Sequence, residues 1–176
     1  MPDDVDSGRR AFLRGRPRPG PSPIRPPWAV ETRFTAACTR CNACVPACPE
    51  GIVAIGDGGF PVVDFRRGEC SFCGACADAC SHPVFQRTDP ATGAVRAPWD
   101  LAALIAEPAC FSVQRVFCRS CGDVCPQSAI RFRLAPGGAA LPVVEQDACS
   151  GCGACVSACP AGAVTVRAVQ KEGFAR

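Results

Sequence analysis

The chain has 176 residues, a formal net charge of +3 and 48% hydrophobic residues, of which its 16 cysteines form a large part. This small charge does not favour nucleic acid as a partner, and the central apolar run 101–106 is far too short to span a membrane. With 18 prolines, 17 glycines and few aromatic residues, the chain needs cross-links to stabilise a weak core, and metal–thiolate bonds can supply them.

Residues 1–29 are predicted to form a flexible, basic, proline-rich arm, because this segment cannot bury enough apolar surface to order itself. The sequence RRAFLR at 9–14 resembles the core of a twin-arginine export signal. No apolar region of sufficient length follows it, so the chain is expected to be cytoplasmic and the arginines to form an ordinary solvated arm. The candidate partner-docking residues are Arg9, Arg10, Phe12, Leu13 and Trp28. Trp28 is expected to anchor first on the chain's own first module.

Four cysteine quartets contain all 16 cysteines, so no thiol remains for a nucleophile. They are Cys38, Cys41, Cys44 and Cys48; Cys70, Cys73, Cys76 and Cys80; Cys110, Cys118, Cys121 and Cys125; and Cys149, Cys152, Cys155 and Cys159. Three have the spacing C-x2-C-x2-C-x3-C, by which bacterial-type ferredoxins hold [4Fe–4S] clusters. In the third quartet the first gap has seven residues, which could leave Cys110 a weak ligand. Three to four [4Fe–4S] clusters are therefore expected per chain.

A secreted disulfide scaffold and structural zinc are the other interpretations of so many cysteines. Disulfide frameworks do not need dense quartets with a proline directly behind them, as at Pro49, Pro126 and Pro160. Zinc favours separated cysteine pairs that close a tetrahedral site, whereas these quartets pack four thiolates more densely. Iron–sulfur clusters are the favoured interpretation.

A hairpin is predicted within each pair of quartets, over 52–65 with a glycine-rich turn at 56–59 and over 129–144 with a turn at 135–138. The chain is thus a duplicated unit of quartet, hairpin and quartet. We predict an α+β fold of two tandem bacterial-type ferredoxin-like modules with two [4Fe–4S] sites each. The predicted boundaries are 30–85 for the first module, 86–109 for a linker, 110–170 for the second module and 171–176 for a tail.

Two further elements are predicted. The linker is expected to contain a short helix over 99–108, capped by Asp100 and ended before Pro108. The alternating residues 163–169 are expected to form a strand of the second module. His82, the only histidine, could tune a cluster by a hydrogen bond or be an ordinary exposed turn residue.

The quartets are predicted to exchange their fourth cysteines, as in two-cluster ferredoxins, where the fourth cysteine of each run ligates the other cluster. In this crossed scheme the four sets are Cys38, Cys41, Cys44 and Cys80; Cys70, Cys73, Cys76 and Cys48; Cys110, Cys118, Cys121 and Cys159; and Cys149, Cys152, Cys155 and Cys125. Spacing alone leaves uncrossed pairings and pairings between the two units open.

The basic arm ending at Trp28, the segment Trp99-Asp100-Leu101 and the stretched third quartet resemble the NapF family, the ferredoxin-type accessory proteins of periplasmic nitrate reductase systems. This resemblance implies a protein that binds the catalytic molybdenum subunit of the reductase before export and assists its maturation, through electron transfer or cluster assembly. The alternatives are a general electron-transfer ferredoxin and a binding module whose clusters are only structural. With no catalytic triad, paired carboxylates or phosphate-binding loop, the chain is not expected to be an enzyme.

Overall fold

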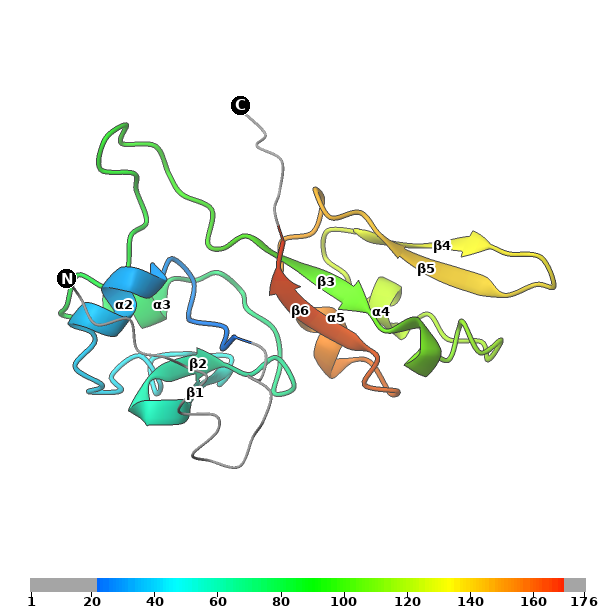
Figure 1. Ribbon diagram of the computed structural model, residues 1–176, viewed down its shortest axis with the longest axis horizontal. Helices are drawn as coiled ribbons and strands as arrows, with labels where there is room; N and C mark the ends of the chain where they lie inside the picture. Colours follow the sequence, from blue (N-terminus) through cyan, green and yellow to red (C-terminus); the bar gives the residue numbers. More distant parts are fainter. Residues whose placement is uncertain (1–21, 170–176) are drawn as a thin grey trace.

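The computed structural model describes residues 22–169, which form an α+β fold of short elements arranged in two halves (Figure 1). We refer to 22–98 as the first half and to 99–169 as the second half. The first half contains α2 (Glu31–Ala37), β1 (Val53–Ile55), β2 (Pro61–Val63) and α3 (Ala75–Asp78). The second contains β3 (Leu101–Ile105), α4 (Ser120–Asp123), β4 (Ile130–Leu134), β5 (Ala140–Val144), α5 (Ala154–Ser157) and β6 (Val164–Ala168). Arg9, Arg10, Phe12, Leu13 and the tail 171–176 lie outside the described residues.

Both predicted hairpins are confirmed. Strands β1 and β2 pair antiparallel with Val53 opposite Val63, and the 3-10 turn Asp57–Gly59 closes the loop between them. Strands β4 and β5 pair with Ile130 opposite Val144. The first hairpin packs against cysteines of its own half, because Ile52, Val53 and Val63 share a buried cluster with Cys44 and Cys76. The second hairpin does the same through Ile130, which is buried with Cys121 and Cys155. The hairpins therefore form part of the walls around the thiols.

The segment predicted as a linker helix is a strand, so that prediction is wrong. Residues Leu101–Ile105 form β3, which pairs antiparallel with β6 over its whole length, with Leu101 opposite Ala168 and Ile105 opposite Val164. Alanine and leucine are among the best helix formers, but helix propensity is a weak predictor that tertiary context overrides. Here β6, which is confirmed as a strand over Val164–Ala168, supplies the backbone partners that β3 needs.

Helix α2 was not predicted from the sequence. Its seven residues bury one large side chain, Phe34, which is 1% exposed and packs against Phe60 and Phe85 at ring-centroid distances of 6.2 Å. A helix with one buried residue gives no hydrophobic periodicity, so the pattern could not reveal it. Within residues 22–169 no helix has the length and apolar character needed to cross a bilayer.

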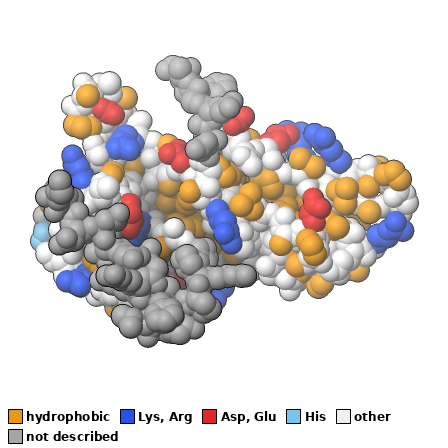
Figure 2. All heavy atoms as spheres, in the orientation of Figure 1, with side chains coloured by type: hydrophobic (Ala, Val, Ile, Leu, Met, Phe, Trp, Pro, Cys, Tyr) orange, Lys and Arg blue, Asp and Glu red, His pale blue; other side chains and the backbone are white. Residues whose placement is uncertain are grey.

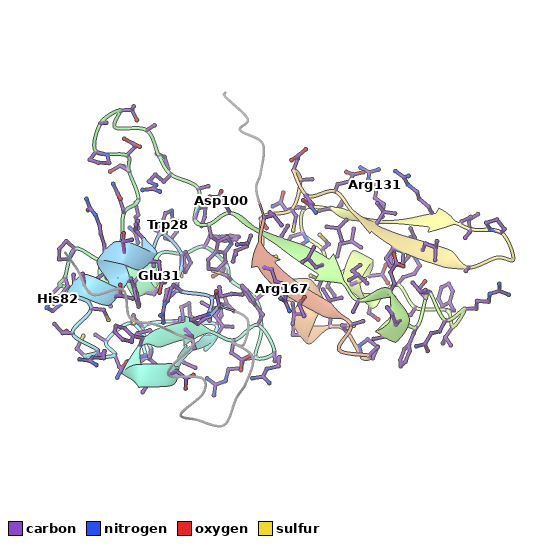
Figure 3. All side chains as sticks on the ribbon, in the orientation of Figure 1. Trp28, Glu31, His82, Asp100, Arg131 and Arg167 are labelled. Atoms are coloured by element: carbon purple, nitrogen blue, oxygen red, sulfur yellow. The ribbon has the colours of Figure 1, made fainter. Side chains whose placement is uncertain are left out.

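The end of the predicted arm, residues 22–29, packs onto the rest of the first half. The backbone N–H of Val63 donates to the carbonyl of Ile24 at 2.7 Å, and Pro26 and Pro27 are buried. Trp28 lies beside α2 in Figure 3, and its Nε1 donates to the carbonyl of Arg96 at 3.1 Å. Trp28 therefore anchors on its own chain, but on Arg96 of the segment predicted as the linker rather than on the predicted first module 30–85.

The two halves meet around Trp99. Its Nε1 donates to the carbonyl of Ser150 at 3.1 Å within the second half. Its ring packs edge-on against Phe65 and Phe72 of the first half, at centroid distances of 5.8 and 5.7 Å. Leu101 of β3 also belongs to the buried cluster of the first half. We call these contacts, with the adjoining Gly153, the junction.

Gly153 has no room for a side chain at the junction. A Cβ at this position would lie 2.0 Å from the ring of Phe65, and its φ of +85° is already unfavourable for other residues. Gly138→Ala is the matched control, since Gly138 has a φ of +83° but no atom within 4 Å of such a Cβ. Gly138→Ala is expected to cost about 1–2 kcal/mol, and Gly153→Ala about 1–3 kcal/mol more through overpacking. Anaerobic thermal unfolding measures both, and equal losses would contradict a close-packed junction.

Candidate metal centres

The 16 cysteines gather into four groups, each lining one small cavity. Site I contains Cys38, Cys41, Cys44 and Cys80, and site II contains Cys48, Cys70, Cys73 and Cys76. Site III contains Cys125, Cys149, Cys152 and Cys155, and site IV contains Cys110, Cys118, Cys121 and Cys159. Each group takes three cysteines from one quartet and the fourth from the other quartet of the same half. The structure thus brings together the same sets as the crossed scheme.

Left-handed backbone turns the three regular quartets into loops. In each quartet the residue before the second cysteine and the residue after it have positive φ. These residues are Arg40 and Asn42, Phe72 and Gly74, and Gly151 and Gly153. Such residues let successive N–H groups point into one concavity, which suits an anionic group, at a cost of about 1–3 kcal/mol for each residue other than glycine. The repeated geometry indicates that the loops are shaped around a shared kind of ligand.

The stretched third quartet reaches site IV by a different route. Its seven-residue gap folds back on itself, with the N–H of Gln114 donating to the carbonyl of Cys110 at 3.0 Å and the N–H of Val116 to that of Phe111 at 2.9 Å. The buried hydroxyl of Ser112 donates to the carbonyl of Ala140 in β5, which fixes the gap to the hairpin. Cys110 is thereby placed in the same cavity as the other three cysteines of site IV.

Short helices orient the third and fourth cysteines of quartets two to four. Helices α3, α4 and α5 each carry the third cysteine, which is buried, and end two residues before the fourth. Quartet one has a hydrogen-bonded turn here instead, and its third cysteine, Cys44, is also buried. In all four quartets the third and fourth cysteines line different sites, so each helix or turn holds two neighbouring cavities together.

Backbone N–H groups donate to several of the cysteine sulfurs. The N–H of Phe72 donates to Cys70 Sγ at 3.4 Å, and the N–H groups of Ala129 and Ala163 donate to Cys125 Sγ and Cys159 Sγ at 3.3 Å. Hydrogen bonds to sulfur stabilise thiolate charge and tune the potential of a bound cluster.

Burial makes the central thiols reluctant to ionise. It raises the pKa of Cys76 and Cys155 to about 12 and that of Cys44, Cys70 and Cys121 to about 11, with neighbouring thiols adding to the effect. At neutral pH these groups would be protonated without a cation nearby, whereas a coordinating metal displaces the proton. These buried thiols therefore need a bound metal in order to ionise at neutral pH.

Each site offers four thiols around one cavity, which is the number of ligands that a [4Fe–4S] cluster takes. No disulfide joins any of the 16 cysteines, all of which lie in the described residues. Within residues 22–169, no group of three His, Cys, Asp or Glu side chains is placed to hold one metal ion. A [4Fe–4S] cluster is larger, and its four thiolates bind separate irons around it. Four converging cysteines with apolar neighbours and inward N–H groups fit that cluster.

His82 lines site I at the outer edge of the first half (Figure 3). Its Nδ1 lies 3.2 Å from Ser81 Oγ, and its carbonyl accepts a hydrogen bond from Cys80 Sγ at 3.5 Å. The side chain is half-buried. The contact that reaches a cysteine thus comes from the backbone of His82, while tuning by its ring stays a hypothesis.

Comparison with known families agrees with this chemistry. Residues 37–85 and 114–172 each match a family model described as a 4Fe-4S dicluster domain. The fold and the cysteine sites define a ferredoxin-type iron–sulfur protein with two tandem dicluster domains and multiple [4Fe–4S] clusters.

The curated relatives narrow the class further. The chain is 44% identical to the ferredoxin-type protein NapF of Escherichia coli (strain K12), over 92% of this chain and 94% of that protein. It is also 44% identical to NapF of Haemophilus influenzae, over 93% of this chain and 96% of the relative. The chain belongs to the NapF family of ferredoxin-type proteins. It is 30% identical to the methylamine utilization ferredoxin-type protein MauM of Methylophilus methylotrophus, over 93% of this chain and 77% of that protein.

Proposed function

We propose that this ferredoxin-type protein acts in the cytoplasm, where it binds the catalytic molybdenum subunit of periplasmic nitrate reductase before export and assists its maturation. The observation that carries the proposal is the likeness to NapF over nearly the whole chain, combined with four complete cysteine sites. The protein is not itself an enzyme in this proposal. It serves its client by electron transfer or by cluster assembly.

Sites I to IV are the proposed ligand sets, so the loaded chain holds four clusters. When bound, each cluster supplies one-electron transfer. The residues of the chain hold it through four thiolates, stabilise its negative charge with backbone N–H groups and limit water with apolar walls. Pro61 and Val84 form part of such a wall at site I, and Ala103 and Ile130 at site III.

Exposed apolar side chains on the second half support a role in contacting another protein. Phe117 is 90% exposed, Leu134 86% and Val116 53%. Figure 2 shows hydrophobic side chains gathered over this half of the molecule. Exposed apolar surface of this kind often marks an interaction site.

Truncation of residues 1–21 tests whether the arm docks the client. Binding to the unexported catalytic subunit is expected to fall at least tenfold, because the docking arginines Arg9 and Arg10 are removed. The iron content is expected to stay unchanged, because Ile24, Pro26 and Trp28 keep their contacts with the first half. The measurement is anaerobic pull-down with the iron of each sample quantified. The charge-preserving variant Arg9→Lys/Arg10→Lys is the matched control for the paired arginines, and unchanged binding after truncation would contradict a docking arm.

The same preparation separates the alternative functions. Anaerobic co-purification with the unexported catalytic subunit, with about 16 iron atoms per chain as four clusters require, would support the role as a maturation factor. The same iron content without a complex would favour a general electron-transfer ferredoxin that supplies an oxidoreductase. Clusters that resist reduction by dithionite would favour a binding module in which they are only structural.

A further inference from the structure

Sites II and III, which belong to different halves, are joined directly by the backbone. The N–H of Cys70, a residue of site II, donates to the carbonyl of Cys152, a residue of site III, at 2.8 Å. The ligand loops of sites II and III are therefore in direct contact through their backbones.

The junction holds this contact in a fixed geometry. Trp99 is tied to the second half by its hydrogen bond to Ser150, the residue between Cys149 and Cys152. Its ring packs against Phe72, the residue between Cys70 and Cys73. One side chain thus connects the ligand loop of site III with the ligand loop of site II, and Gly153 allows the close approach because it has no Cβ.

Within each half, the two sites are neighbours through shared buried residues. Cys44 of site I and Cys76 of site II belong to one buried cluster, and Cys121 of site IV and Cys155 of site III belong to another. The order in space is therefore site I, site II, site III and site IV. In a pair of independent two-cluster modules, by contrast, sites II and III would have no direct connection.

We infer that the four sites form one electron path whose crossing between the halves is the Cys70 to Cys152 backbone hydrogen bond, held by Trp99. This inference rests on the proposed ligand sets. With clusters bound at these sites, a transfer between neighbouring sites would move one electron from a donor cluster to an acceptor cluster, without a change in any bond or proton. Electron transfer weakens steeply with distance, so the crossing requires that the two halves stay in one arrangement.

The decisive test uses full-length variants with one site left in each half. The inner-pair variant keeps sites II and III and carries Cys38→Ser, Cys41→Ser, Cys110→Ser and Cys118→Ser. The outer-pair variant keeps sites I and IV and carries Cys70→Ser, Cys73→Ser, Cys149→Ser and Cys152→Ser. Each is expected to hold about eight iron atoms, four per cluster. Both are reduced with dithionite, and their electron paramagnetic resonance spectra are compared.

The inner-pair variant is expected to show a broadened and split spectrum from two interacting spins, whereas the outer-pair variant gives two separate signals. Any interaction in the inner pair must cross the junction, because no second site remains in either half. An inner-pair variant with about eight iron atoms and no spin interaction would overturn the inference. Wild-type chain that holds far fewer than about 16 iron atoms would instead count against the proposed ligand sets.

A second measurement decides the question if the inner-pair variant does not hold iron. In the loaded wild-type chain, the amide hydrogen of Cys70 is expected to exchange slowly. Trp99→Ala should speed exchange of the peptide that contains Cys70 at least tenfold. Trp28→Ala is the matched control, because the Trp28 ring makes the same 3.1 Å hydrogen bond from Nε1 to a carbonyl, but to Arg96 rather than to the ligand loop of site III. Fast exchange at Cys70 in the wild type, or no difference between the two variants, would overturn the inference.

Discussion

The double variant Cys48→Ser/Cys73→Ser is expected to lose about four iron atoms per chain, whereas Cys41→Ser/Cys48→Ser is expected to lose about eight. The reason is the grouping of the cavities: Cys48 lines site II together with Cys73, while Cys41 lines site I. The first pair therefore damages one cluster and the second pair damages two, although Cys41 and Cys48 belong to the same quartet.

Iron and sulfide quantification on anaerobically purified protein measures these losses. Ser71→Ala is the matched control, because Ser71 also lines site II but supplies no thiolate. It is expected to leave the iron content unchanged. Under uncrossed ligation the two double variants would exchange their results, so the order of the two iron losses distinguishes crossed from uncrossed ligation.

Removal of the clusters is expected to unfold both halves. The helices of the described residues span at most seven residues and the strands at most five. Cysteines also make up a substantial part of both buried clusters. Without metal, the thiols around each cavity would stay buried and unligated in a core that has few other large side chains. Binding free energy at such sites is folding free energy, so the apo chain should lose cooperative structure.

Hydrogen exchange of β3 and β6 measures this loss. These strands pair with each other between the two buried clusters, so their amide hydrogens report on both. After iron removal with a chelator and a mild oxidant, exchange over 101–105 and 164–168 is expected to accelerate at least tenfold. Resupply of iron and sulfide under reducing conditions is the control and should restore protection. Protected strands in the apo chain would show that the core is stable without its metal.

Local features of the fold could be predicted because they depend on residues close in sequence. The hairpins follow from apolar runs around glycine-rich turns, and the chemistry follows from the two-residue gaps between cysteines. The crossed grouping was also predictable, from the general behaviour of two-cluster ferredoxins. In contrast, α2 was missed because a single buried phenylalanine carries no periodic pattern.

The sequence by itself determined the ligand type, the number of candidate sites and the duplicated unit, since these depend on cysteine identity and spacing. Only the tertiary structure decided that 101–105 is a strand, because its backbone partner, β6, lies about 60 residues further along the chain. It also decided that the backbone of Cys70 contacts that of Cys152 and that Trp99 packs against two phenylalanines of the first half. Contacts between distant segments arise from mutual burial, and the local pattern of one segment does not indicate which other segment it will contact.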